Sequence, residues 1–434
     1  MRERLTRTLE RAPRAVLTLY AVVAAFSTYF AMYAFRKPFA AASYHGQSIA
    51  IGPVEVDLKG ALIIGQLVGY ALSKVVGVKL NSELSHERRL LALVLIIGFA
   101  EAALVLFAFS PPGLQVAAMF LNGVPLGTVW GICFSFLEGR QTSEILGAGL
   151  SCAYIVASGV VKTIGKSLLD AGVSEAWMPA VCGGIFVLPF LLFAFALSLV
   201  PAPGQADVTH RTHREPMDAA ARRRFTRRYW PGLLMLVVTY LFLTAYRDFR
   251  DNFQADIWRE MGQGGSAVFT TTEVPIALGV MAVLSLLYLL KSNRAGLITT
   301  YGIMIGGSIL VGAGTLLFDA GAIGPRAWMT LVGLGLYLAY VPYGCVLFDR
   351  TIAVLGTVAT AVFLIYVSDA VAYSGSVGVV AYKIFGQADL PYLDFFRIFS
   401  YAMSLATTAL FVWSLTYFLR QPGKERGGEL SHRT

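Results

Sequence analysis

Apolar residues along the chain gather in blocks of about twenty, and short polar stretches separate these blocks. A helix rises about 1.5 Å per residue, so a block of this length can cross a hydrocarbon core that is ~30 Å thick. Internal Gly and Pro do not interrupt the blocks, since neighbouring helices in a bundle can satisfy the freed backbone groups. The pattern predicts an all-α polytopic membrane protein with twelve spans, at residues 15–40, 58–78, 90–109, 112–137, 145–168, 177–200, 230–247, 268–290, 295–317, 327–348, 351–382 and 393–419.

Composition agrees with this class. Hydrophobic residues make up 56% of the 434 residues, and charged residues only 14%. A soluble protein carries roughly 25% charged residues, so this chain has too little polar surface for a water-facing globule. The formal net charge of +9 does not indicate a nucleic-acid partner, because the basic residues lie between the apolar blocks and form no single patch. The lipid bilayer is the partner that the composition predicts.

The distribution of Lys and Arg predicts the topology. Most of the 35 basic residues lie in the two tails and in the loops after even-numbered spans. The positive-inside rule then places both termini in the cytoplasm. The basic start of the chain runs into an apolar stretch longer than that of a signal peptide, so we interpret it as an uncleaved first span. We expect an integral protein of a bacterial inner (plasma) membrane.

A basic stretch divides the chain into two sets of six spans. We predict an N-terminal six-helix bundle at residues 1–200, a basic cytoplasmic linker at 201–229, a C-terminal six-helix bundle at 230–420 and a cytoplasmic tail at 421–434. This layout is typical of transporters built from two bundles, whose substrate site lies between the halves near the middle of the bilayer. We expect such a protein to act as a monomer.

Three polar residues of the first span share one helix face. Tyr29, Tyr33 and Arg36 are spaced i, i+4 and i+7. One interpretation is an aromatic belt with a cation that reaches to the membrane surface. The apolar stretch continues past Arg36, however, and an ionisable residue at depth usually faces a cavity or a partner. This continuation favours a functional role for Arg36.

Similar residues occur in two other spans. Tyr240 and Arg247 are spaced i, i+7 in the seventh span, as Tyr29 and Arg36 are in the first. Asp251, one turn on, could neutralise Arg247 and make it a structural ion pair. In the second span Tyr70 and Lys74 are spaced i, i+4, and Lys74 could equally be an anchor at the inner surface.

Other ionisable residues within the spans leave alternatives open. Glu273 and Asp369 could titrate as proton-coupling carboxylates, or each could pair with a cation in the bundle. Lys162 and Lys166 share a face of the fifth span and could line a cavity or an outer vestibule.

Two arginines from opposite halves suit an anionic substrate. A guanidinium group does not lose its proton in proteins, and its fork of donors grips an oxyanion bidentately. Nearby tyrosine hydroxyls would add neutral donors. The sequence shows no nucleophile elbow, zinc motif or phosphate-cradling loop, so we expect no enzyme, no metal and no cofactor. The four cysteines lie in apolar blocks without ligand spacing: Cys133, Cys152, Cys182 and Cys345.

At these residues the chain resembles the organophosphate:phosphate antiporters of the major facilitator superfamily. The stretch YFAMYAFRKPFAAA is similar to that family's first-span Tyr-x-x-x-Tyr-x-x-Arg-Lys-x-Phe segment. The stretch that begins DLKGALIIGQLVGYALSK is similar to its second span, where a Tyr-x-x-x-Lys pair occurs. The resemblance implies the major facilitator fold, with Arg36 and Arg247 as phosphate-binding arginines. It implies that the following residues line the same cavity: Tyr29, Tyr33, Tyr70, Lys74, Trp130, Tyr154, Tyr340 and Tyr373.

Three positions depart from the family pattern. Tyr154 stands where the antiporters carry a substrate-binding histidine, and Thr244 stands where a tyrosine precedes the second arginine. The loop after the second span has Glu83 and Leu84 in place of the family's Asp-Arg pair. These departures affect phosphate-ester specificity more than anion binding.

Together these features predict a secondary active transporter. It would move a small organic anion, a phosphate ester or phosphate, by alternating access, with exchange for phosphate as the inherited mode. Two alternatives remain: proton-coupled symport of another organic anion through Asp369 or Glu273, and a transporter-like sensor that binds a ligand without moving it.

Overall fold

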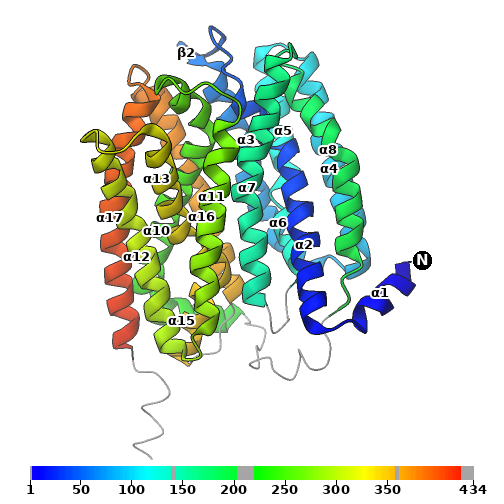
Figure 1. The fold of residues 1–434 in the computed structure, drawn as a ribbon, viewed down its shortest axis with the longest axis vertical. Helices are drawn as coiled ribbons and strands as arrows, with labels where there is room; N and C mark the ends of the chain where they lie inside the picture. The colour runs from blue at the N-terminus through cyan, green and yellow to red at the C-terminus, as the bar shows by residue number, and fades with distance from the viewer. Residues whose placement is uncertain (1, 138–142, 203–218, 357–360, 422–434) are drawn as a thin grey trace, which may run out of the picture.

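The computed structural model describes residues 2–137, 143–202, 219–356 and 361–421 (Figure 1). We call residues 2–202 the first half and residues 219–421 the second half. The first half contains α1 (Arg2–Glu10), α2 (Arg14–Met32), η1 (Tyr33–Phe35), η2 (Pro38–Ala41), β1 (Ser48–Ile51), β2 (Val54–Asp57), α3 (Leu58–Glu83), α4 (His86–Phe109), α5 (Pro112–Leu126), α6 (Val129–Ser135), α7 (Ser143–Asp170) and α8 (Met178–Ser198).

The second half contains α10 (Ala219–Glu260), α11 (Val268–Ser285), η3 (Leu286–Leu289), α12 (Asn293–Asp319), α13 (Pro325–Tyr340), α14 (Pro342–Cys345), α15 (Leu347–Leu355), α16 (Ala361–Ala381), η4 (Tyr382–Gly386) and α17 (Tyr392–Arg420). Within the described ranges, nine helices are long and apolar enough to cross a membrane, and a pair bent by 54° at Cys345–Leu347 makes a tenth. Helices α3 and α16, of 26 and 21 residues, lie at the second and eleventh predicted spans.

Proline interrupts three of the predicted spans. The first span leaves the α-helix after Met32 and continues as two short 3₁₀ helices, the second of which begins at Pro38. Pro125 precedes the break between α5 and α6, and Pro342 begins the short helix α14. Proline has no backbone N–H, so each of these prolines removes one helical hydrogen bond close to a break.

The basic stretch between the halves is partly helical. Helix α10 begins at Ala219 and runs for 42 residues, so the last part of the predicted linker at 201–229 belongs to this helix. Residues 203–218 of that linker and residues 422–434 of the predicted tail lie outside the described residues.

A β-hairpin joins the first and second spans and was not predicted. Strands β1 and β2 pair antiparallel, with Ser48 opposite Asp57, and the turn contains Gly52 at a positive φ of 62°. Asp57 then begins α3, since its carboxylate accepts a hydrogen bond from the backbone N–H of Gly60 at 3.1 Å. Burial raises the pKa of the Asp57 carboxyl. In Figure 1 the hairpin lies at the opposite end of the molecule from α1, and we call this the hairpin end.

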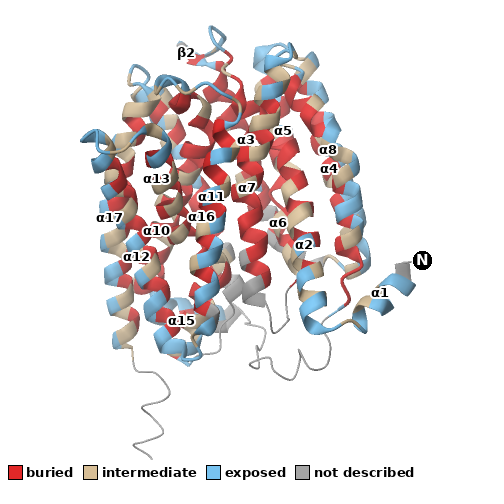
Figure 2. Cartoon of the chain, in the orientation of Figure 1, coloured by how far each residue is buried: buried red, intermediate tan, exposed pale blue. Residues whose placement is uncertain are grey.

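The halves meet along two helix pairs. Helix α3 of the first half packs against α16, and α7 packs against α11. Buried residues follow the faces on which helices pack, whereas exposed residues lie on the outer faces and the loops (Figure 2). Many of the exposed residues are large and apolar, such as Leu95 and Leu405, as expected for a surface that contacts lipid.

Close approach of α3 and α5 depends on glycine. A Cβ added to Gly123 of α5 would overlap the backbone oxygen of Gln66, and one added to Gly69 of α3 would overlap the backbone oxygen of Phe120. Small residues of this kind let helix backbones approach within a membrane. The polar residues that α3 and α5 carry are thereby held in contact.

We expect Gly123→Ala to destabilise the protein by about 1–3 kcal/mol, because the backbone atoms that the added methyl meets must shift. The measurement is thermal unfolding of the purified protein in detergent. Gly98→Ala in α4 is the matched control, since a Cβ there meets nothing within 4 Å. Equal melting temperatures for the two variants would contradict the prediction.

Candidate functional site

A pocket, which we call the cavity, lies between the two halves, and about 520 Å³ of space, part of it open solvent, is enclosed by its walls and mouth. Tyrosine and charged side chains dominate its lining, although the helices that carry them are otherwise largely apolar. The first half contributes Tyr29, Tyr33, Arg36, Tyr70, Lys74, Trp130, Ser151 and Tyr154, and the second half contributes Tyr240, Arg247, Tyr340, Val341, Gly344, Ile365, Asp369 and Tyr373.

All ten residues that the sequence predicted to bind substrate are among these lining residues. Of the two predicted coupling carboxylates, Asp369 also lines the cavity, whereas Glu273 does not. The structure therefore brings the predicted set together from five helical segments of the first half and three helices of the second. Their part in binding stays a prediction.

Arg36 is held at the break in the first span. Its backbone oxygen accepts a hydrogen bond from Gln66 Nε2 at 2.9 Å, and Gln66 in turn donates to Asn122 Oδ1 at 2.9 Å. Asn122 Nδ2 donates to the backbone oxygen of Phe35 at 3.0 Å. Two amide side chains thus satisfy backbone groups that the interrupted helix leaves free.

The guanidinium group of Arg36 lies over an aromatic ring. Its central carbon is 3.9 Å from the ring centre of Tyr70 and 5.8 Å from that of Tyr33. The side chain is only 3% exposed, and its Nε has no hydrogen-bond partner among the described residues. A buried guanidinium with an unused donor is suited to receive an anion.

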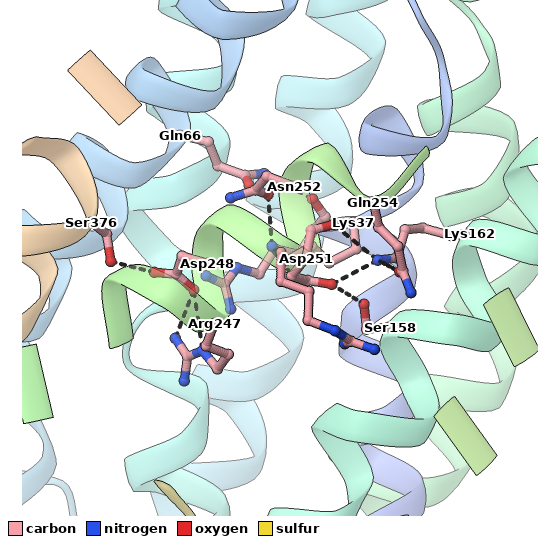
Figure 3. Close-up of polar contacts among 12 residues, drawn as sticks. Lys37, Gln66, Ser158, Lys162, Arg247, Asp248, Asp251, Asn252, Gln254 and Ser376 are labelled. Atoms are coloured by element: carbon pink, nitrogen blue, oxygen red, sulfur yellow. Dashed lines mark hydrogen bonds and ion pairs between the residues drawn. The ribbon is translucent and has the colours of Figure 1, made fainter. Parts of the chain in front are cut away.

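Arg247 is already paired with its neighbour in the sequence. Its Nη2 lies 2.8 Å from Asp248 Oδ1, and its Nε donates to the same oxygen at 3.2 Å. Nη1 donates to the hydroxyl of Tyr340, and Nη2 also donates to that of Tyr373 at 3.3 Å. The counter-charge of Arg247 is therefore Asp248, and Asp251 points away from it (Figure 3).

Lys74 and Asp369 form an ion pair across the halves. Lys74 Nζ lies 3.1 Å from Asp369 Oδ2, and Tyr240 donates from its hydroxyl to Asp369 Oδ1 at 2.9 Å. Lys74 is 8% exposed and lines the cavity, so it is not an anchor at the membrane surface. Of the two roles considered for Asp369, the pairing role is present in this conformation.

Glu273 lies beside the cavity in a separate ion pair. Its Oε1 is 2.8 Å from Arg250 Nη1 and accepts a hydrogen bond from Gln254 Nε2 at 2.8 Å. Both Glu273 and Arg250 are fully buried. Of the two roles considered for Glu273, the structure therefore shows the ion pair with a cation. Direct coupling to a substrate would need its carboxylate to face the cavity, which it does not.

A second polar group lies one turn further along α10. We call it the Asp251 cluster, and Figure 3 shows that Lys37 and Lys162 both point to the same carboxylate. The distances to the Asp251 oxygens are 2.5 Å from Lys37 Nζ and 2.7 Å from Lys162 Nζ. Its members are Lys37, Ser158, Lys162, Asp251, Asn252 and Gln254.

The cluster belongs to the contact between the halves. Lys37 and Lys162 come from the first half, and Asp251 comes from the second. Nearer the hairpin, Lys59 Nζ lies 2.6 Å from Asp256 Oδ2. Lys166, expected on the same face as Lys162, instead pairs with the partly exposed Asp170 at 2.6 Å and takes no part in the cluster.

Sequence reasoning missed the residues that support the site. Asp248 follows Arg247 directly, and neighbours at i, i+1 are not expected to face each other on a helix. Gln66 shows only as a polar residue in an apolar span, which is a weak signal. Ser376, which donates to Asp248 Oδ2 at 2.7 Å, shows no sequence signal beyond its polarity.

Solved structures with similar folds span nearly the whole chain. A D-xylose-proton symporter is 13% identical with a TM-score of 0.58, and covers 94% of this chain and 98% of its own. The nucleoside transporter NupG is 11% identical with a TM-score of 0.57, covering 93% and 100%. A peptide transporter, POT, is 14% identical with a TM-score of 0.60, covering 94% and 95%.

These likenesses confirm the predicted all-α polytopic fold, with two six-helix bundles as in the major facilitator superfamily. At such low identity they show the fold alone. The resemblance to the organophosphate:phosphate antiporters stays a prediction.

Family membership comes from the sequence itself. No curated protein matches the chain. Residues 38–421 match a family whose description is a family of unknown function, DUF5690. That match covers most of the 434 residues and parts of both halves. It includes Arg247 and begins two residues after Arg36. The chain belongs to the DUF5690 family.

Proposed function

We propose that the protein is a secondary active transporter that moves a small organic anion across the membrane by alternating access. The observation that carries this proposal is the pair of arginines, Arg36 and Arg247, that line one cavity from opposite halves. A ligand that contacts both halves can couple its binding to their relative movement. The named functions of the structural neighbours are in keeping with transport.

The charges of the cavity support an anion. Arg36 offers donors that no described residue uses, and the tyrosine hydroxyls beside Arg247 offer further donors. An unpaired buried cation is costly in a low dielectric, so an anion would stabilise it. An empty cavity should therefore reorient more slowly than an occupied one.

The contacts between the halves support movement rather than a fixed fold. Lys74 with Asp369, Lys59 with Asp256, and the two lysines with Asp251 all join one half to the other. Each pair can separate and re-form as the halves rock, because it is made by side chains and not by covalent structure. The ion pairs at the hairpin end would hold that end closed in this conformation.

Phosphate or a phosphate ester is the first substrate class to test, because the resemblance in the first two spans implies it. Exchange for phosphate is the mode that the same resemblance implies. Tyr154, in place of the family's histidine, leaves room for another organic anion.

Proton-coupled symport is the second candidate, and the position of Asp369 favours it. Its carboxylate lines the cavity and pairs with Lys74 across the halves. A substrate that enters the cavity could displace Lys74 from Asp369 and so favour protonation of the carboxylate. One of the structural neighbours is itself a proton symporter by name.

The test is counterflow in liposomes that contain the purified full chain. Inorganic phosphate, glycerol 3-phosphate and benzoate serve as labelled probes outside, with the same unlabelled probe inside. We expect at least one probe to accumulate only in preloaded liposomes. A pH-sensitive dye in the lumen detects proton entry with the probe, which would indicate symport. Probes that bind the detergent-purified protein but never cross would contradict transport and indicate a sensor.

A further inference from the structure

The cavity holds fewer free positive charges than its three cations suggest. The basic side chains are Arg36, Arg247 and Lys74, and all three line the cavity. Asp369 lines it as well, and Asp248 contacts the guanidinium of Arg247 from behind. Three cations and two carboxylates leave a net formal charge of one positive.

The two carboxylates neutralise particular cations. Asp248 Oδ1 lies 2.8 Å from Nη2 of Arg247, and Asp369 Oδ2 lies 3.1 Å from Nζ of Lys74. Arg247 also gives a donor to Tyr340, so most of its fork is already engaged. Arg36 makes no ion pair with any described carboxylate, and it is the cation that carries the remaining charge.

The other buried cations near the cavity are engaged by residues outside its lining. In the Asp251 cluster, Lys162 Nζ is within 2.9 Å of three oxygens, from Asp251 and Gln254. Lys37 Nζ contacts Asp251 and donates to Asn252 Oδ1 at 2.8 Å. Arg250 is paired with Glu273. None of these residues lines the cavity.

The uncharged part of the lining is mostly aromatic. Seven tyrosines and Trp130 make up half of the sixteen lining residues, and the aliphatic side chains among them are Val341 and Ile365. Ring contacts close the wall between the halves, with the centres of Tyr70 and Tyr373 5.0 Å apart. Such surfaces favour a flat ring through stacking and edge contacts.

We propose that the cavity selects a monovalent oxyanion attached to a ring, with its charge against Arg36, and that Asp248 excludes divalent anions by neutralising Arg247. This inference rests on the proposed anion site. A divalent anion in the cavity would keep one negative charge without a counter-ion, which a low dielectric makes costly. A carboxylate and a phosphodiester share the required chemistry.

Two pairs of probes with matched rings separate charge from shape. Benzoate is monovalent and phthalate divalent, while methyl phenyl phosphate is monovalent and phenyl phosphate divalent at pH 8. Dissociation constants come from ligand-dependent thermal shifts of the full chain in detergent. For the wild-type protein we expect the monovalent member of at least one pair to bind about tenfold more tightly than its partner. The pair that responds identifies the oxyanion as carboxylate or phosphoryl.

Asp248→Asn then tests the residue. Asparagine keeps the shape and the acceptor oxygen but removes the charge, so we expect the preference to move about tenfold toward the divalent probe. Asp319→Asn is the matched control, since Asp319 pairs with Arg397 away from the cavity. We expect it to leave the ratio unchanged. If Asp248→Asn does not fold, the wild-type preference alone still decides the charge of the ligand.

Three results would overturn the inference: a wild-type preference for the divalent probes, an unchanged ratio in folded Asp248→Asn, or no binding of any of the four probes. Counterflow of another anion alongside any of these would leave the proposed transport intact. Conversely, monovalent selectivity without flux would support the inference and contradict transport.

Discussion

We expect the replacement of Arg36 by glutamine to weaken the proposed anion binding by roughly a hundredfold, because the loss of one partner from a buried charge pair costs about 2–5 kcal/mol. Arg36 forms no ion pair with a described carboxylate and has an unused Nε donor, and no second cation is placed to replace its charge there. Arg36→Lys should recover only part of the affinity, since lysine keeps the charge but loses the planar fork. Isothermal titration with whichever probe binds the wild-type protein gives the constants.

The control for Arg36 is Arg326→Gln. Arg326 lies in the first turn of α13, is exposed and does not line the cavity. It removes the same charge from the protein as a whole, so an effect of net charge alone would appear in both variants. Unchanged affinity in Arg36→Gln would show that the anion, if one binds, is held elsewhere.

Replacing Asp251 by asparagine lowers the stability of the protein by about 3–5 kcal/mol, because it leaves Lys37 and Lys162 buried without their shared counter-charge. Both ammonium groups are nearly inaccessible to water, so solvent cannot replace the carboxylate. We expect a lower melting temperature in detergent. Hydrogen exchange should also quicken where α7 meets α10.

Two further variants make this result specific. Combining Asp251→Asn with Lys162→Met removes one of the unpaired cations, so stability should partly recover. Asp170→Asn breaks the Lys166 ion pair, which is partly exposed, and should cost less than about 1 kcal/mol. Equal losses for Asp170→Asn and Asp251→Asn would contradict the role given to the Asp251 cluster.

The sequence predicted the spans and the cavity lining well because both depend on simple physics. A span needs about twenty apolar residues, and an ionisable side chain within a span is costly unless it faces a cavity or a partner. Tyr29, Tyr33 and Arg36 could be grouped because helix periodicity places them on one face. The prediction that both arginines line one cavity came from the two-bundle layout, which places the substrate site between the halves.

Periodicity within one helix does not say which residue of another helix lies opposite. For that reason the sequence could not assign Lys74 to Asp369 or Lys37 to Asp251, whose partners are far away along the chain. It favoured Asp251 for Arg247 by its spacing of one turn, whereas the long arginine side chain folds back onto Asp248. The hairpin was missed because its two strands are only four residues long and lie between two apolar segments with much stronger helical patterns.

The ion pairs between the halves share one direction of charge. Across the described contacts, each such pair joins a lysine of the first half to an aspartate of the second: Lys37 and Lys162 to Asp251, Lys59 to Asp256, and Lys74 to Asp369. Two copies of the first half would bring ammonium groups face to face, and two copies of the second would bring carboxylates together. Each half is therefore complementary to the other and repels its own kind, so the charges that hold the molecule together also prevent either half from assembling with a duplicate of itself during synthesis.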